Sequence, residues 1–112
     1  MLPRSKRVRL TADIQTIYKQ GVHSRHSLLR LYALPRGRAE SRATVVVSKQ
    51  VHLHATIRNR IKRRLRAQLS RLLPKLHKAS DLVVVAQRPA AQADAAQLNT
   101  ALEHALHKLH LL

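Results

Sequence analysis

The chain has 112 residues, a length that suits one small domain over residues 1–112, and 45% of them are hydrophobic, which is enough for a single core. Twenty-two Lys and Arg face only five Asp and Glu, so the formal net charge is +17. A charge this far from zero opposes a compact state and favours a densely anionic partner, with nucleic acid as the first candidate and an anionic membrane surface as the second. The lack of cysteine excludes disulfides and Cys-ligated zinc.

The N-terminal part of the chain predicts an extended arm followed by a short helix. Residues 1–10 are basic and lack periodicity, which is typical of an extended basic arm. Thr11 is placed to cap a helix on which Ile14 and Tyr18 share one side. Gly21 is placed to end this helix.

Two strands are predicted next. Residues 26–34 are rich in Leu, and residues 42–48 contain the run Thr-Val-Val-Val, whose β-branched side chains favour a strand. The segment 35–38, Pro-Arg-Gly-Arg, separates them as a turn or loop. Because this connection is short, we expect the two strands to form an antiparallel pair.

The most informative segment is 58–66, Arg-Asn-Arg-Ile-Lys-Arg-Arg-Leu-Arg, in which cations and aliphatic residues alternate at helical spacing. We predict a helix from a cap at Thr56 to about Leu73, ended by Pro74. Its apolar stripe consists of Ile57, Ile61, Leu65 and Leu72, and its opposite side carries Asn59, Lys62, Arg63 and Arg66. Such a helix packs inward and presents hydrogen-bond donors to a polyanion.

The remaining segments predict one more strand and one more helix. Residues 81–86 form an uninterrupted apolar run suited to a sheet interior, and residues 90–112 predict a helix with a Leu- and Ala-rich stripe. The order is α-β-β-α-β-α. The strands before and after the basic helix can lie parallel, and general rules make such a crossover right-handed.

The residues supply no self-sufficient enzyme, and we expect no catalytic side chain and no metal ligand from this chain. The acids are scattered, and Gly21 and Gly37 are the only glycines, so there is no phosphate-binding glycine loop. His104, His107 and His110 recur every third residue, but this row turns by about 60° per step around a helix instead of converging. We interpret these histidines as solvated.

Three features have competing interpretations. The Asn59–Arg66 face can be an RNA-binding surface or a solvated face, and the shortage of acids favours RNA. Tyr18 can stack on an unpaired base or pack in the core. Ser48 and Lys49 end a strand close to the basic helix, where they can bind a phosphate or point to solvent.

Several segments together resemble the bacterial ribonuclease P protein subunit. They are Leu-Pro at 2–3 followed by basic residues, Asp-Ile-Gln at 13–15, Tyr-Lys-Gln-Gly at 18–21, Val-Val-Ser-Lys at 46–49, and Asp-Leu-Val-Val-Val-Ala-Gln-Arg-Pro at 81–89. Residues 55–66 (ATIRNRIKRRLR) are similar to that family's signature helix almost residue for residue. The resemblance spans nearly the whole chain.

The resemblance implies an α/β (α+β) two-layer sandwich with a small mixed sheet in the order α-β-β-(β)-α-β-α, where the strand in parentheses is optional. It also implies a left-handed β-α-β crossover in place of the general right-handed one. It implies a protein that joins the catalytic RNA subunit of ribonuclease P and assists removal of the 5′ leader from precursor tRNA. Magnesium ions (Mg2+) held mainly by the RNA would activate the water molecule that attacks the cleaved phosphodiester bond. The implied RNA-binding residues are Arg58, Asn59, Arg60, Lys62, Arg63 and Arg66, and the implied leader-cleft residues are Ile14, Tyr18, Ser48 and Lys49.

This sequence departs from the family pattern at three positions, since Ile14 replaces a usual Phe, Gln50 a common second Lys, and Thr44 a usual Gly. We expect a cytoplasmic protein with no membrane partner and no obligatory protein partner, because no apolar run approaches the ~18 residues of a membrane span. The alternatives are a structural RNA-binding protein of the ribosome-associated type with no role in cleavage, and a membrane-surface protein.

Overall fold

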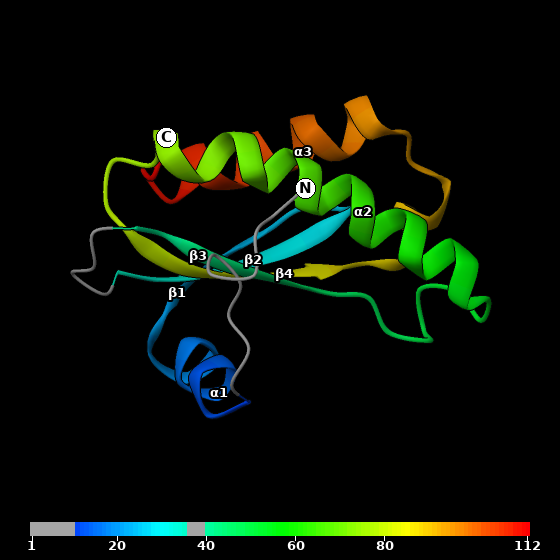
Figure 1. The fold of residues 1–112 in the computed structure, drawn as a ribbon, viewed down its shortest axis with the longest axis horizontal. Coiled ribbons are helices and arrows are strands. Elements are labelled where there is room, and N and C mark those ends of the chain that lie inside the picture. The colour runs from blue at the N-terminus through cyan, green and yellow to red at the C-terminus, as the bar shows by residue number, and fades with distance from the viewer. Residues whose placement is uncertain (1–10, 36–39) are drawn as a thin grey trace.

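A computed structural model describes residues 11–35 and 40–112, so the predicted arm at 1–10 lies outside the described residues. One mixed sheet carries helices on both faces (Figure 1). In chain order the elements are α1 (Thr11–Gln20), β1 (Val22–Arg25), β2 (Leu29–Pro35), β3 (Arg42–Val46), α2 (Ala55–Leu72), the 3-10 helix Leu73–Lys75, β4 (Ser80–Ala86), the 3-10 helix Arg88–Gln92, and α3 (Ala95–Lys108).

The four strands lie in the order β1-β2-β4-β3. β2 pairs antiparallel with β1 and with β4, whereas β3 and β4 are parallel. The predicted antiparallel pairing of β2 with β3 is therefore wrong, because β4, the most completely buried strand, takes the interior place between them. The predicted parallel arrangement of β3 and β4 through α2 is confirmed. The left-handed sense of this crossover stays a prediction.

The residues of the edge strand β1 did not predict it, although the fold implied by the resemblance left room for a third strand before the basic helix. Its four residues are Val-His-Ser-Arg, and only Ser24 is buried, so the segment carries no hydrophobic alternation to reveal a strand. The strand forms because α1 ends at Gln20 and the chain turns back along β2, in register from Val22 opposite Ala33 to Arg25 opposite Arg30.

The main core lies between the sheet and the α2/α3 layer, which confirms the predicted α/β sandwich (Figure 1). The largest fully buried side chains there include Leu29, Leu31, Ile61, Leu65, Leu69, Leu82, Leu98, Leu102 and Leu106. α1 packs on the opposite face of the sheet, where Ile17 and Val83 form the centre of a smaller cluster. In the part of the chain that the structure describes, α2 and α3 therefore cover one face of the sheet and α1 packs on the other.

The helix ends differ from the prediction at two places. α2 begins at Ala55 after the N-cap His54, so the predicted cap Thr56 is wrong and lies one residue inside the helix. α3 begins at Ala95 because Asp94 and Gln97 form a reciprocal capping box, while part of the segment predicted as its first turns is a 3-10 helix. Among the described residues, no helix is long and apolar enough to cross a membrane.

Candidate nucleic-acid interface

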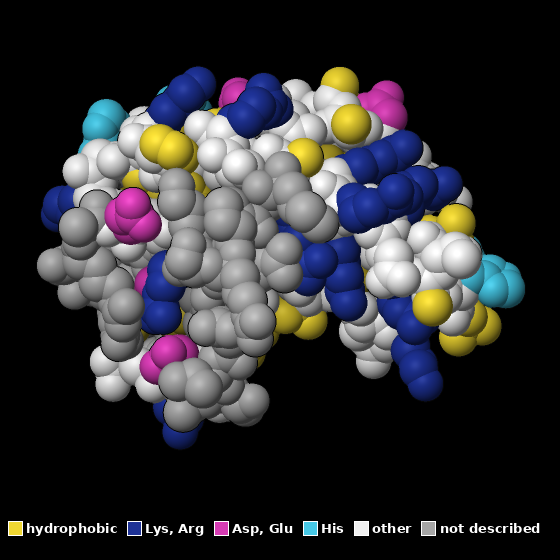
Figure 2. Space-filling view, viewed as in Figure 1, with side chains coloured by type: hydrophobic (Ala, Val, Ile, Leu, Met, Phe, Trp, Pro, Cys, Tyr) yellow, Lys and Arg dark blue, Asp and Glu magenta, His cyan; other side chains and the backbone are white. Residues whose placement is uncertain are grey.

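The cationic side of α2 is positioned by its apolar side. Ile61, Leu65 and Leu72 are buried against the sheet, and Ile57 is partly buried. Lys and Arg side chains gather over α2 in the space-filling view (Figure 2). Of the predicted RNA-binding residues on this side, Asn59 and Arg63 are exposed, whereas Lys62 and Arg66 are partly buried.

The other two predicted RNA-binding residues, Arg58 and Arg60, lie partly buried near the start of the helix. Arg58 Nη1 donates to the backbone oxygens of His52 and Leu53, at 2.9 and 2.8 Å, and so secures the segment that leads into α2. Arg60 Nε is buried and has no hydrogen-bond partner among the described residues. Arg58 therefore has a structural role besides any contact with RNA.

A second set of polar side chains on α2 faces α3 and was missed by sequence reasoning. Arg64 Nη1 donates to the Ala93 carbonyl at 3.0 Å, and Gln68 Nε2 donates to the Ala95 carbonyl at 3.1 Å. Arg71 donates to Gln68 Oε1 and, at 3.3 Å, to Asn99 Oδ1. The signal for this contact was Gln68, a polar residue at a buried position between Leu65 and Leu72. α2 thus carries cations that are used inside the fold and cations that are free to meet a ligand.

Two of the predicted leader-cleft residues, Ile14 and Tyr18, lie on α1 in the smaller cluster. The Tyr18 and Tyr32 rings meet edge to face, with centroids 4.8 Å apart. Burial, and secondarily the neighbouring Tyr32, raises the pKa of the Tyr18 hydroxyl above 10.0. Tyr18 is thus a neutral, partly buried ring that packs on another ring, and its stacking on a base stays a prediction.

The other two predicted leader-cleft residues, Ser48 and Lys49, are exposed just after β3, and each borders a hollow. Ser48 lines a hollow of about 480 Å³ that also includes Arg30, Gln87 and Arg88. Lys49 lines a hollow of about 710 Å³ with Gln50, Val51, His52, Leu53, His54 and Arg88. The structure therefore brings Ser48, Lys49 and the helix start together, while Ile14 and Tyr18 line neither hollow.

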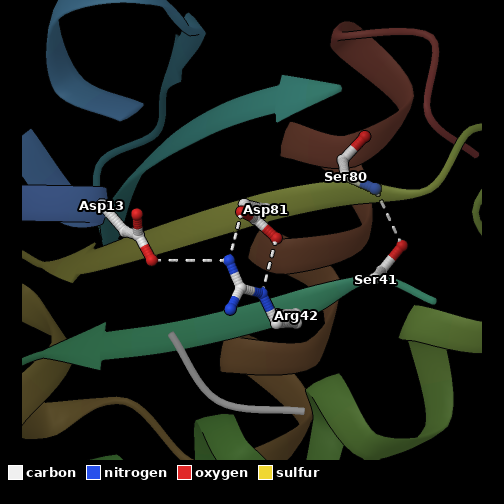
Figure 3. A network of polar contacts seen from close by, with 5 residues as sticks. All are labelled: Asp13, Ser41, Arg42, Ser80 and Asp81. Carbon is white, nitrogen blue, oxygen red and sulfur yellow. Dashed lines mark hydrogen bonds and ion pairs between the residues drawn. The ribbon is translucent and has the colours of Figure 1, made fainter. Parts of the chain in front are cut away.

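A buried ion pair, also missed by sequence reasoning, ties α1 to the sheet (Figure 3). Arg42 Nε and Nη2 donate to the two carboxylate oxygens of Asp81, at 3.1 and 2.8 Å, and Arg42 Nη2 lies 3.7 Å from Asp13 Oδ2 on α1. The hydrogen bonds with Asp81 raise the pKa of the Arg42 guanidinium, although burial acts in the opposite direction. Beside this pair, Ser80 N donates to Ser41 Oγ at 3.0 Å. The network fixes where α1 sits on its face of the sheet.

Among residues 11–35 and 40–112, no three His, Asp or Glu side chains form a group that could hold a metal ion. His104, His107 and His110 are exposed. The described side chains therefore do not fit a magnesium site, and no chemical step is assigned to a metal on this chain.

The fold and the cationic α2 define a small, basic α+β protein with a surface suited to a polyanion. The family model described as Ribonuclease P matches residues 2–110, so the chain belongs to the ribonuclease P protein family. Curated relatives named "Ribonuclease P protein component" include one from Synechocystis sp., 38% identical over 75% of this chain and 68% of its own length. Another, from Xylella fastidiosa, is 36% identical over 98% of this chain and 80% of its own length.

Solved structures have the same fold. The RNase P protein of Staphylococcus aureus matches with a TM-score of 0.85 and 29% identity, over 95% of this chain and 96% of that one. The RNase P protein of Thermotoga maritima, in complex with 1-(4-fluorophenyl)-2-thiourea, matches with a TM-score of 0.80 and 25% identity, over 88% of this chain and 94% of that one. The resemblance inferred from the sequence is thereby confirmed, and membership of this family implies a role in an endoribonuclease complex with an RNA subunit.

Proposed function

We propose that this chain binds the catalytic RNA of ribonuclease P through α2 and assists Mg2+-dependent removal of the 5′ leader from precursor tRNA in the cytoplasm. One observation carries the proposal: α2 buries an apolar stripe and turns a row of cations outward with almost no acids to pair with them. Among residues 11–35 and 40–112, the ion pairs join Arg42 to Asp13 and Asp81, so the α2 cations stay available for phosphates.

The side chains of this chain suit binding and positioning of RNA, and not catalysis. In our proposal the RNA holds the magnesium ions that activate the attacking water, and the protein binds and positions. Asn59, Lys62, Arg63 and Arg66 would contact the catalytic RNA, with Arg58 and Arg60 at the edge of that surface. Catalytic RNA and substrate are both polyanions, so a protein of net charge +17 between them would reduce their repulsion.

The leader would pass along the α1 side of the sheet toward Ser48 and Lys49. Ser48 can donate a hydrogen bond to a phosphate oxygen and Lys49 can neutralise its charge. Both side chains are exposed, and Lys49 borders a hollow that reaches His54, the N-cap of α2. A strand bound there would lie next to the RNA bound by α2.

Reconstitution tests the proposal. Precursor tRNA is incubated at low magnesium with a bacterial ribonuclease P RNA, with the protein, and with both. We expect cleavage at the mature 5′ end only where the RNA is present, and a strong increase when the protein is added. A folded, RNA-binding preparation that gives no increase would contradict the proposal and favour the ribosome-associated alternative, for which co-sedimentation with ribosomes at high salt is the check.

A further inference from the structure

A large hydrophobic side chain is held out in solvent just before α2. Leu53 is 80% exposed, the largest exposed fraction among the large hydrophobic side chains of the described residues. Two imidazoles flank it, and the ring centroids of His52 and His54 lie 5.1 Å apart. Histidine and hydrophobic side chains meet at this end of the molecule, next to the cations over α2 (Figure 2). We call residues 52–54 the His-Leu-His segment.

The His-Leu-His segment is tied to the fold at both ends and in the middle. Val51 before it is buried in the main core, and His54 is the N-cap of α2. His54 N donates to His52 Nδ1 at 3.0 Å. Arg58 Nη1 donates to the carbonyl oxygens of His52 and Leu53, at 2.9 and 2.8 Å. Hydrogen bonds from a charged donor are stronger than neutral ones, so Arg58 restricts the positions that the Leu53 backbone can take.

The side chains of the segment suit a flat, largely apolar partner. Unpaired RNA bases are recognised by stacking on aromatic rings, histidine among them, and by apolar contact. The hollow of about 710 Å³ that the segment lines also includes Lys49 and Arg88, which can hold the phosphates next to such a base. None of the described residues that line this hollow is acidic. Apolar and aromatic surface bordered by cations alone fits a nucleobase better than it fits a protein.

We propose that the His-Leu-His segment docks an unpaired base of the catalytic RNA, and that Arg58 is a positioning residue that holds Leu53 in place for this contact. The inference rests on the proposed function and adds a second kind of contact to it, because the α2 cations bind phosphates whereas the segment binds a base. Stacking and apolar burial depend little on salt, unlike phosphate contacts. The segment would give α2 a site-specific contact that phosphate binding alone does not supply.

The first test is binding of the full-length protein to a bacterial ribonuclease P RNA over a range of salt concentrations. The wild type is compared with Leu53→Ala, Leu53→Met and the control Val22→Ala, which shortens the other exposed large hydrophobic side chain of the described residues. We expect Leu53→Ala to bind about tenfold more weakly, with an unchanged slope of log affinity against log salt. Leu53→Met and Val22→Ala should bind like the wild type. Wild-type affinity of Leu53→Ala, or a reduced slope, would overturn the inference.

A double-mutant cycle tests the role of Arg58. Arg58→Met should weaken RNA binding of the wild type, and weaken it less where Leu53 is already alanine, because Arg58 then has no side chain to position. Arg63→Met, on the exposed side of α2, is the control and should have the same effect in both backgrounds. An arginine that only stabilised the fold or only bound a phosphate would behave like this control. Equal effects of Arg58→Met in both backgrounds would therefore overturn its positioning role.

Folding and the identity of the partner are checked separately. Because Leu53 is exposed, urea unfolding of Leu53→Ala should match that of the wild type, so a loss of binding is not a loss of fold. The chain has no cysteine, so Leu53→Cys provides a single attachment point for a photoreactive group. In the holoenzyme with bound precursor tRNA we expect crosslinks to unpaired nucleotides of the catalytic RNA. Crosslinks to the precursor alone would overturn the inference and leave the proposed function in place, whereas a wild-type protein that does not bind the catalytic RNA would overturn both.

Discussion

Arg42 and Asp81 are the residues on which the position of α1 depends most. Asp81 is fully buried and receives two hydrogen bonds from Arg42, which also lies 3.7 Å from Asp13 on α1. Removing one member of a buried pair leaves the other charge in a medium that solvates it poorly. We therefore predict that Arg42→Met lowers the free energy of unfolding by about 3 kcal/mol in urea denaturation.

The double variant Arg42→Met/Asp81→Leu is the control for this prediction, because it removes both charges. It should recover much of the loss, since buried pairs are often replaced by apolar residues at little cost. A single variant as stable as the wild type would show that the pair does not anchor the fold.

Tyr18 gives a prediction in the alkaline range. Its pKa is raised above 10.0 by burial and by Tyr32, so the fold favours the protonated phenol. That stabilisation is fully present below pH 10.0 and is lost as the pH rises through the raised pKa. In a Tyr32→Phe variant Tyr18 is the only tyrosine, and tyrosinate absorbance should titrate above pH 10.0 when folded and near 10.0 in denaturant. Identical titrations in the two states would contradict the packing of Tyr18.

At the residue scale, sequence reasoning found the outward cations of α2 but not the inward ones. Helical periodicity alone separates Arg63 from Leu65. It does not reveal that Arg64 reaches the Ala93 carbonyl or that Arg42 meets Asp81, because these contacts join residues 29 and 39 positions apart. Such partners depend on how the elements pack, which a local pattern does not contain.

Among the elements, α2 separates structural from ligand-binding charge, and this separation can be tested within one helix. Arg63→Ala/Arg66→Ala should weaken binding to the catalytic RNA and reduce the salt slope by about 2, since each phosphate contact contributes about 0.9. Arg64→Ala should instead lower stability and leave the slope nearly unchanged, because Arg64 is bonded to the Ala93 carbonyl. Salt-dependent binding isotherms and urea curves measure the two effects, and equal slopes for Arg63→Ala/Arg66→Ala and the wild type would exclude this face from phosphate contact.

The junction between α1 and β1 depends on Gly21. A Cβ at this position would lie 2.6 Å from the backbone oxygens of Ala33 and Ile17, which is closer than real contacts allow. We predict that Gly21→Ala lowers the free energy of unfolding by about 1–3 kcal/mol, because backbone has to shift. Gln20→Ala, one residue earlier at an exposed position, is the control and should be nearly neutral. Equal stability of the two variants would contradict the close approach.

At the element scale, the helices and the three longer strands could be predicted, because each buries a continuous apolar pattern. β1 could not, since an exposed edge strand of four polar-rich residues carries no such pattern. The sheet order could not either, because β4 lies between β2 and β3 although it follows both in the chain and is separated from them by α2. Pairing between strands distant in sequence is decided by burial of the whole core.

For the whole molecule, the net charge of +17 is the property that matters most. In our account α2 binds one RNA and the α1 side of the sheet binds another, so the protein lowers the repulsion between them. Magnesium ions otherwise perform that screening, and a protein that replaces part of it should reduce the magnesium requirement without changing where the RNA is cut.

The most direct measurement is a magnesium titration of precursor-tRNA cleavage by a bacterial ribonuclease P RNA, with and without this protein. The account predicts that the protein moves the midpoint to lower magnesium, that the mature 5′ end is unchanged, and that Arg63→Ala/Arg66→Ala reverses much of the shift. Superimposable titrations with and without a folded, RNA-bound protein would contradict it.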